Sequence, residues 1–425
     1  RLFPFASRRV SYVMSPETAD DLRSWLIEPD YSAEQREPLR LDEQQKRWAT
    51  TRTTSGYRRL RGPAGSGKSS VLAARAAILA QEGKDVLVVS FNITLLNYLR
   101  DLYSRAEKKY RSNVTWMNFS LWCRRTAMEL GIFGLYGEAW HRHFEHNEDA
   151  FAQIPKLIDK HINSSPAAIT MYDAILVDEG QDFDPFWWNL LRKVCRNGGE
   201  MLFVADITQD IYGTGKRWTD SVMEGAGFRG RWVECPISYR MPRPLITLAA
   251  EFAEAFLPVP TLPRAPERQG QLEVTCTELR WVQVDEDAGA QTCFSELMRL
   301  IRADSESSRA MVDLTLLTDS VSNGCDVVRL LNEAGVKTVE SFAVPVPGQP
   351  IGRGDDRRKK LAFWKGDARV KVCTIHSFKG WEGRLLVLYL SRNTDRGLGY
   401  VGLTRLKDHP RGSCLTVVCA DRRMK

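Results

Sequence analysis

The sequence has no CxxC pair, no low-complexity tract and no apolar run of about 18 residues. The missing run excludes a membrane-spanning helix, and the missing pair removes the usual spacing signal of a structural zinc site. The nine cysteines are odd in number and lie scattered through the chain, as at Cys195, Cys235, Cys373 and Cys419. They therefore predict reduced thiols in a cytosolic protein and argue against a disulfide scaffold.

The amino-terminal stretch lacks the features of a targeting segment. It reads RLFPFASRRV, which has no apolar core of signal-peptide length, so secretion is not expected. The first residue is Arg1 and not Met, which hints at a fragment of a longer protein. A processed or trimmed chain would look the same.

Positive charge exceeds negative charge only slightly. The net charge is +7, with 43% hydrophobic and 27% charged residues, which is the composition of an ordinary globular protein. Basic clusters occur at residues 57–61, 108–111 and 357–360. They are consistent with a nucleic-acid partner, but any single cluster of this kind is more often a solvated face.

Short, continuous apolar runs alternate with helical patterns along the chain. Its 425 residues exceed one ordinary core and predict two or three domains. The apolar runs predict strands buried on both faces, as in parallel sheets of βαβ units. They lie at residues 85–91, 174–178, 201–206, 370–375, 385–390 and 414–419, and residues 71–81 are expected to be a helix.

This pattern predicts an α/β fold of two doubly wound parallel-sheet domains. We expect residues 1–40 to be an amino-terminal extension or the tail of a preceding domain. Residues 41–235 would form the first domain, with a small helical insertion at about 111–170. Residues 236–425 would form the second domain.

The most specific motif is a complete GxxxxGK[ST] stretch at residues 62–69, between a predicted strand at 57–61 and the predicted helix. Its glycines let backbone N–H groups surround phosphates, and the following helix adds a positive dipole. We expect Lys68 to reach the β and γ phosphates and Ser69 to ligate Mg²⁺. The predicted cradle consists of Gly62, Pro63, Ala64, Gly65, Ser66, Gly67, Lys68, Ser69 and Ser70.

Acidic residues follow the predicted strand at residues 174–178. Asp178 is expected to hold Mg²⁺, and Glu179 to orient and deprotonate the attacking water. Gln209 follows the next strand, where it could sense the γ-phosphate. Taken alone, Gln209 is more typical of a surface residue.

Together these segments resemble the UvrD/Rep/PcrA family of superfamily-one DNA helicases, because the family's motifs occur in order from residue 41 to residue 405. Residues 41–45 are similar to the Q motif, 178–182 to the DExQD motif and 209–212 to the QxxY motif. Residues 238–240, 374–382 and 400–405 are similar to the three motifs of the second domain.

The resemblance implies two RecA-like domains with ATP and Mg²⁺ between them. It implies that Gln45 reads adenine, that Tyr239 stacks on it and that Glu382 contacts the ribose. Arg240 would be an arginine finger, and Arg405 a second contact to the γ-phosphate. The implied nucleic-acid contacts are Phe91, Asn92, Asn118, Phe119, Thr374, His376 and Ser377.

Two departures from the family concern the engagement of nucleic acid. Only residues 241–373 separate Arg240 from Thr374, so the large insertion of full-size relatives is absent or vestigial. The tryptophan that relatives place just after the QxxY motif is also missing, and the nearest one is Trp218. The other aromatic-rich stretches, 114–122 and 183–188, are more typical of core packing than of base stacking, with Asn118 and Phe119 as the exception.

The resemblance therefore implies an ATP-dependent translocase or helicase on single-stranded DNA, with 3′-to-5′ polarity, in a bacterial cytoplasm. RNA remains open as a substrate, because a motor that grips backbone and stacked bases needs little base readout. The alternative is an ATP-gated nucleic-acid-binding module that controls an attached or partner nuclease without productive unwinding. The missing insertion and the start at Arg1 motivate it. The wording of the motifs is also similar to UvrD-like proteins with a nuclease-related domain. A small-molecule kinase would leave the second-domain motifs without a role. Repair is the default pathway, with anti-phage defence and nuclease-coupled processing as alternatives.

Overall fold

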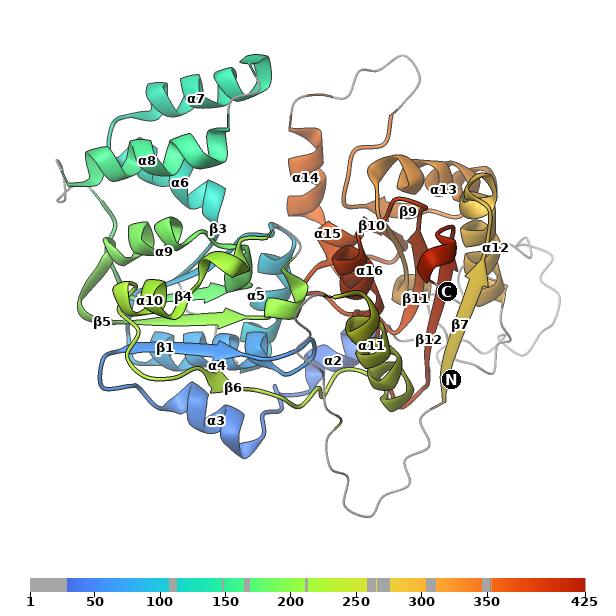
Figure 1. The fold of residues 1–425 in the computed structure, drawn as a ribbon, viewed down its shortest axis with the longest axis horizontal. Helices are drawn as coiled ribbons and strands as arrows, with labels where there is room; N and C mark the ends of the chain where they lie inside the picture. The colour runs from blue at the N-terminus through green and yellow to red at the C-terminus, as the bar shows by residue number, and fades with distance from the viewer. Residues whose placement is uncertain are drawn as a thin grey trace, which may run out of the picture.

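Two parallel β-sheets lie side by side in the computed structural model, each flanked by helices (Figure 1). The structure describes residues 29–106, 113–146, 149–163, 169–210, 213–257, 265, 276–302, 311–345, 352 and 354–424. Each sheet has six strands, and neighbouring strands pair in parallel. The predicted fold class, two doubly wound α/β domains, is confirmed.

The first sheet has the strand order β3-β2-β4-β5-β1-β6. Its strands are β1 (Tyr57–Arg61), β2 (Val86–Ser90), β3 (Val114–Asn118), β4 (Tyr172–Asp178), β5 (Cys195–Ala205) and β6 (Val233–Glu234). Alternate residues of β2 enter different cores: Val86 and Val88 pack with helices α4 (Lys68–Gln81) and α5 (Leu95–Ala106), whereas Leu87 and Val89 pack on the opposite face. Two-sided burial explains why these strands are continuous apolar runs.

The opposite face of the first sheet carries the helical insertion. Helix α6 (Phe119–Glu129) follows β3, and α7 (Phe133–His146) and α8 (Ala150–Ile162) stand above the sheet in Figure 1. Helices α9 (Pro185–Arg192) and α10 (Asp220–Gly225) complete this layer. The range expected for the insertion, 111–170, thus includes β3, an edge strand of the sheet, and the inserted helices begin at Phe119.

The second sheet has the order β7-β12-β11-β8-β10-β9. Its strands are β7 (Thr277–Gln283), β8 (Leu314–Thr318), β9 (Thr338–Glu340), β10 (Val370–Thr374), β11 (Leu385–Leu390) and β12 (Ser413–Cys419). Its helices are α11 (Arg243–Phe256), α12 (Gly289–Arg302), α13 (Val321–Glu333), α14 (Asp355–Ala362), α15 (Ile375–Phe378) and α16 (Arg396–Leu403). The described elements between α11 and β10 are therefore three strands of this sheet and helices α12, α13 and α14.

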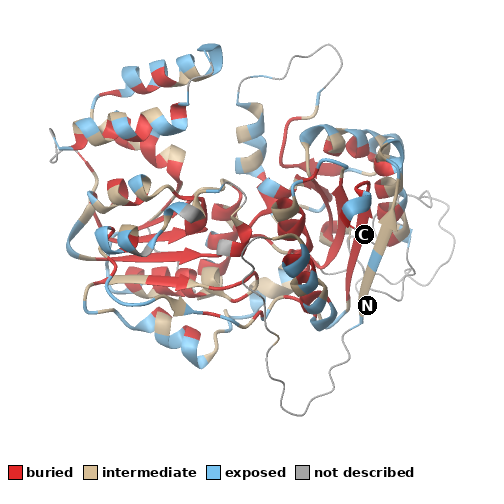
Figure 2. Ribbon diagram, in the orientation of Figure 1, coloured by how far each residue is buried: buried red, intermediate tan, exposed pale blue. Residues whose placement is uncertain are grey.

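An apolar interface joins the two domains. One cluster of buried side chains includes Leu95 and Tyr98 of α5 together with Phe363 and Trp381 of the second domain. The rings of Tyr98 and Trp381 lie 5.6 Å apart. Most strands of both sheets are largely buried, whereas the edge strand β7 is not, and α7 and α14 are largely exposed (Figure 2).

Two helices precede the first sheet, α2 (Asp30–Arg36) and α3 (Glu43–Thr50). The short 3-10 turns are η2 (Gly180–Asp182), η3 (Ile207–Gln209), η4 (Gly215–Arg217), η5 (Glu286–Ala288), η7 (Met311–Asp313) and η8 (Arg422–Met424). All nine cysteines are free thiols. Among the residues described, no helix combines the length and apolarity needed to cross a bilayer. Of the amino-terminal extension expected at residues 1–40, residues 1–28 lie outside the described part.

Candidate functional site

The glycine-rich loop connects β1 to α4 at the carboxyl edge of the first sheet. Gly65 and Gly67 have φ angles of 75° and 80°, the left-handed region that favours glycine. A Cβ on Gly67 would lie 2.4 Å from Nε2 of Gln45, and one on Gly65 would lie 2.6 Å from Cβ of Arg240. Since Gly67 provides no side-chain cap, the first N–H groups of α4 remain available to an anion.

The ammonium group of Lys68 lies over this loop. It donates to the carbonyl oxygens of Gly62 and Pro63, both at 2.8 Å, and lies 3.2 Å from Oγ of Ser66. The carboxylate of Asp206 is 3.9 Å away. The lysine is therefore held at the mouth of the cradle, where a phosphate can exchange for the two carbonyl contacts.

Asp178 ends β4 beside the loop, and its surroundings fit a divalent cation. Its Oδ1 accepts the N–H of Glu179 at 2.9 Å, while Oδ2 is buried without a hydrogen-bond partner. Burial, together with the neighbouring charge of Glu179, raises the pKa of Asp178 to about 7, and the Ser69 hydroxyl acts in the opposite direction. An orphaned carboxylate oxygen next to a hydroxyl is the donor set that Mg²⁺ shares with bound phosphates. Among the described residues no cluster of three or more His, Cys, Asp or Glu side chains is placed to hold a metal.

Glu179 occupies the left-handed backbone region, with φ 54°, and is the one non-glycine residue of the described part to do so. Such strain is typical of functional residues, because the surrounding structure must enforce it. Nε2 of Gln181 donates to its carboxylate, and Nζ of Lys379 lies 3.8 Å away. Burial would raise the pKa of Glu179, but Lys379, Lys68 and Arg405 outweigh it and lower the pKa. The carboxylate is thus kept ionised, as a proton acceptor requires.

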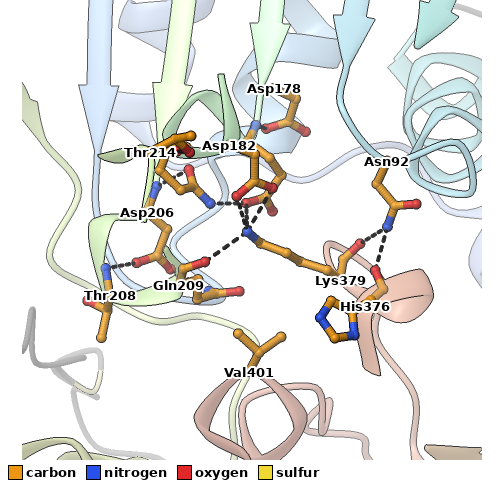
Figure 3. A network of polar contacts seen from close by, with 12 residues as sticks. Asn92, Asp178, Asp182, Asp206, Thr208, Gln209, Thr214, His376, Lys379 and Val401 are labelled. Carbon is orange, nitrogen blue, oxygen red and sulfur yellow. Dashed lines mark hydrogen bonds and ion pairs between the residues drawn. The ribbon is translucent and has the colours of Figure 1, made fainter. Parts of the chain in front are cut away.

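Gln209 links the two domains and is buried, so the interpretation of it as a surface residue is wrong. Its Oε1 accepts Nη2 of Arg405 at 2.7 Å, and its Nε2 donates to the carboxylate of Asp206. Figure 3 shows Gln209 beside Asp206. Burial, with the nearby charge of Arg240, lowers the pKa of Arg405 to about 10, which leaves it protonated at neutral pH. A change at Asp206 can therefore be passed directly to an arginine of the second domain.

Lys379 is a site residue that the sequence reasoning did not assign. Its Nζ lies 2.7 and 2.8 Å from the two carboxylate oxygens of Asp182 and 2.8 Å from the carbonyl oxygen of Gln209 (Figure 3). Both partners of this ion pair are almost fully buried. Its one signal in the sequence is its place between His376 and Glu382, a stretch expected to contact nucleic acid and ribose.

Arg240 and Glu382 form a second charged pair in the cleft. Nε of Arg240 donates to Oε2 of Glu382 at 2.7 Å, and Nζ of Lys407 lies 3.4 Å from Oε1 of the same carboxylate. Burial would raise the pKa of Glu382, but Lys407, Arg240 and Lys365 lower it far below its usual range. Lys407 was also missed, since it lies just beyond the last motif.

A third group of residues closes the far end of the cleft. Nε2 of Gln45 donates to the carbonyl oxygen of Ser66 at 3.2 Å, and its Oε1 caps α3 by accepting the N–H of Asp42. The Tyr239 hydroxyl donates to Oδ2 of Asp42 at 2.6 Å, while 46% of Tyr239 remains exposed. An open aromatic face beside an amide is suited to a flat heterocycle.

These groups line one cavity of about 580 Å³ between the domains. The predicted residues that it brings together are Gln45, Ala64, Gly65, Ser66, Gly67, Lys68, Ser69, Ser70, Glu179, Gln209, Tyr239, Arg240, Glu382 and Arg405. Asp42, Tyr98 and Lys407 also line it. A cavity of this size, lined by the phosphate loop and by the open ring of Tyr239, accommodates a nucleotide. Gly62, Pro63 and Asp178 are not among its lining residues.

A family model described as an AAA domain matches residues 45–215, and no curated protein matches the chain. The match covers the glycine-rich loop, Asp178, Glu179 and Gln209, which are the phosphate end of the cavity. The first domain is a P-loop NTPase. The match therefore implies nucleotide binding with a divalent metal and points to a nucleoside triphosphate hydrolase.

The residues expected to contact nucleic acid differ in their surroundings: some are buried or join the two domains, and others are exposed. Asn92 donates its amide to the carbonyl oxygens of His376, Ser377 and Lys379, at 3.0 to 3.2 Å, so here it joins the two domains (Figure 3). Ser377 is buried, and the Thr374 hydroxyl caps α15 by accepting its N–H. His376 is exposed at this edge.

The structure does not support the expected nucleic-acid contacts at Asn118 and Phe119. Both residues are buried, and the Phe119 ring stacks on Trp187 at 4.5 Å. Phe91 also stacks on Trp187, at 6.0 Å, and is only partly buried. Trp218 also packs in the core, 4.7 Å from Phe203. Tyr212, the last residue of the QxxY motif, lies outside the described residues.

Proposed function

We propose that this protein is an ATP-dependent translocase on single-stranded DNA of the UvrD-like type, moving 3′ to 5′. The contact between Gln209 of the NTPase domain and Arg405 of the second domain carries this proposal. A glutamine bound to an arginine across a nucleotide cleft makes the relative position of two domains depend on the γ-phosphate. A motor needs that dependence, and a simple nucleotide-binding enzyme does not.

In the proposed hydrolysis, the chain binds, orients and neutralises. The N–H groups of α4 and the ammonium of Lys68 hold the phosphates, while Asp42, Gln45 and Tyr239 hold the adenine. Ser69 and Asp178 would hold Mg²⁺, which neutralises phosphate charge. Glu179 accepts the proton of the attacking water.

Arg240 and Arg405 stabilise the charge that develops on the transferred phosphoryl group. Because both belong to the second domain, they act only when the cleft is closed. Loss of the γ-phosphate would then weaken the closed state, and repeated opening and closing would move a strand bound along half-buried Thr374 and exposed His376.

ATPase rates with single-stranded DNA, duplex DNA and RNA test this proposal, with Lys68→Ala as the control for contaminating activity. We expect single-stranded DNA to stimulate hydrolysis most strongly, and a tailed duplex to be displaced only with a 3′ overhang. Stimulation without displacement would favour the ATP-gated regulatory module. If no nucleic acid changes the rate, the translocase proposal is wrong.

A further inference from the structure

Helix α2 precedes the NTPase domain in sequence but is anchored in the second domain. Asp30 is 3% exposed, and its carboxylate contacts Arg384 at 3.4 Å and, more closely, Arg411. Its backbone N–H donates to Asp313 at 3.2 Å, and Nε2 of His409 lies 3.5 Å from its carboxylate. The buried charge on the first residue of α2 is therefore compensated entirely by the second domain in these contacts.

Glu34 lies one turn further along α2 and is paired on both oxygens. Its Oε2 accepts Nζ of Lys365 at 3.0 Å, and its Oε1 accepts Nζ of Lys407 at 2.7 Å. All three side chains are largely buried, with exposed fractions of 13%, 14% and 23%. Solvent therefore screens these contacts much less than those of a surface pair.

Lys407 extends this contact to the nucleotide cavity. It reaches Glu382 at 3.4 Å, and the other oxygen of Glu382 accepts Arg240 at 2.7 Å. Four groups of alternating charge, Glu34–Lys407–Glu382–Arg240, thus run from α2 to an arginine beside the phosphate loop. The low pKa of Glu382, which Lys407 and Arg240 maintain against burial, agrees with a strongly coupled series.

The opposite side of α2 contacts the first domain. The Tyr31 hydroxyl donates to Asp101 of α5 at 2.9 Å, and Gln35 donates to the same carboxylate at 2.5 Å. The segment after α2 then hydrogen-bonds to α5 through the N–H of Leu39, 3.3 Å from the carbonyl oxygen of Arg105, and leads to Gln45. Helix α2 therefore touches both domains, and the segment that follows it lines the cavity from Leu39 onward.

We propose that Glu34 is a positioning residue for triphosphate hydrolysis, because it holds Lys407 in place and thereby sets the contact of Glu382 with Arg240. This inference rests on the hydrolysis assigned to the site and not on nucleic-acid translocation. Without the charge on Glu34, Lys407 is drawn to Glu382, the other acidic partner that the structure gives it. Glu382 then holds Arg240 less firmly, and the arginine is worse aligned when the cleft closes.

The first test compares Glu34→Gln with wild type in ATPase assays without nucleic acid. We expect kcat to fall about tenfold, with KM for ATP changed less than about threefold, since the nucleotide-binding groups remain in place. Glu34→Asp should recover part of the loss. The matched control is Glu37→Gln, because Glu37 is exposed and pairs only with Arg40 in the described ion pairs; its kcat should remain within about twofold of wild type.

A second test asks whether the effect passes through Lys407. Lys407→Met should lower kcat on its own, and adding Glu34→Gln to it should lower kcat by no more than about a further twofold. If Glu34→Gln does not fold, Lys407→Met tests the same series of contacts. An unchanged kcat in a folded Glu34→Gln variant, or a full second loss in the Lys407→Met background, would overturn the proposal.

The failures of the two proposals are distinguishable. Wild-type ATPase that does not respond to nucleic acid removes the translocase but leaves Glu34 under test. Wild-type ATPase with Glu34→Gln equal to wild type removes only the role of Glu34. A wild-type chain that hydrolyses no triphosphate overturns both.

Discussion

At the scale of single residues, two adjacent carboxylates have opposite electrostatic surroundings. Asp178 is buried with an unpaired oxygen and has a raised pKa, which makes it a poor anion until a cation arrives. Glu179 faces three cationic side chains and has a lowered pKa. Neighbouring groups with separated pKa values are suited to different tasks, here cation binding and proton acceptance.

Glu179→Gln should separate binding from hydrolysis. The amide preserves size and most hydrogen bonds but cannot accept the proton of water, so we expect a loss of at least about 100-fold in kcat. Affinity for ATP, measured with a fluorescent analogue, should change less than about threefold. An unchanged hydrolysis rate would remove Glu179 as the base.

Lys68→Ala should abolish measurable turnover, because its ammonium contacts the carbonyl oxygens of the loop that would hold the phosphates. Lys84→Ala is the matched control, since Lys84 is an exposed lysine just beyond the other end of the same helix. Circular dichroism should show both variants folded. Normal turnover in Lys68→Ala would contradict the assignment of the cradle.

At the scale of elements, α14 carries basic side chains and lies between the second sheet and the helical insertion (Figure 1). Burial and the charge of Lys379 lower the pKa of His376, and the charge of Lys360 lowers it further. Burial raises the pKa of Tyr136 of α7, and the charge of Arg357 acts on that pKa in the opposite direction. The helix therefore faces both the predicted strand-binding edge and the insertion (Figure 1).

If the translocase proposal holds, Arg357→Ala combined with Lys360→Ala should weaken the stimulation by single-stranded DNA. The salt dependence of apparent affinity should decrease by about 0.7 for each phosphate that the protein no longer neutralises, because fewer counterions are released. ATPase without DNA should be unchanged. The control pair, Arg329→Ala with Lys337→Ala, removes the same charge from α13 and the amino edge of β9. If the apparent affinity for DNA depends on salt concentration equally in the two double variants, α14 does not contact the DNA strand.

At the scale of the whole molecule, the domains are joined by buried polar contacts within an apolar interface. Asp182 and Lys379 are almost fully buried and bring together residues far apart in sequence. Removing one partner of a buried pair leaves a charge without compensation, which costs about 3–5 kcal/mol. The closed arrangement is thus sensitive to single changes in this pair.

Lys379→Met should lower the free energy of unfolding by about that amount, and Asp182→Asn in the same chain should restore a substantial part. Urea unfolding of the two single variants and the double variant measures the coupling. Additive losses would show that the pair does not couple the domains.

Much of the fold was predictable, because the signals are local. Continuous apolar runs marked β2, β4, β5, β10, β11 and β12, since strands buried on both faces do not alternate apolar with polar residues. The bounds of the helical insertion were predicted less exactly. Val114–Asn118 lies within the expected helical range, but pairing with β2 makes it an edge strand.

The candidate site divides in the same way. The roles of Lys68 and Asp178 depend on neighbours in sequence, and their surroundings fit the prediction. Phe119 looked suited to base stacking, but its ring is covered by Trp187, which follows in the chain only after the insertion. Burial of an aromatic ring depends on what packs against it, and sequence spacing does not report that.

The sequence by itself determined the phosphate cradle, the carboxylates and the two-domain α/β fold, because these follow from turn chemistry and strand periodicity over a few residues. Only the tertiary structure decided that Gln209 meets Arg405, that Lys379 enters the first domain, and that α2 connects both domains to Arg240. These contacts join residues whose separation along the chain is too long for local propensities to act. Packing of the two sheets alone brings them within hydrogen-bonding distance.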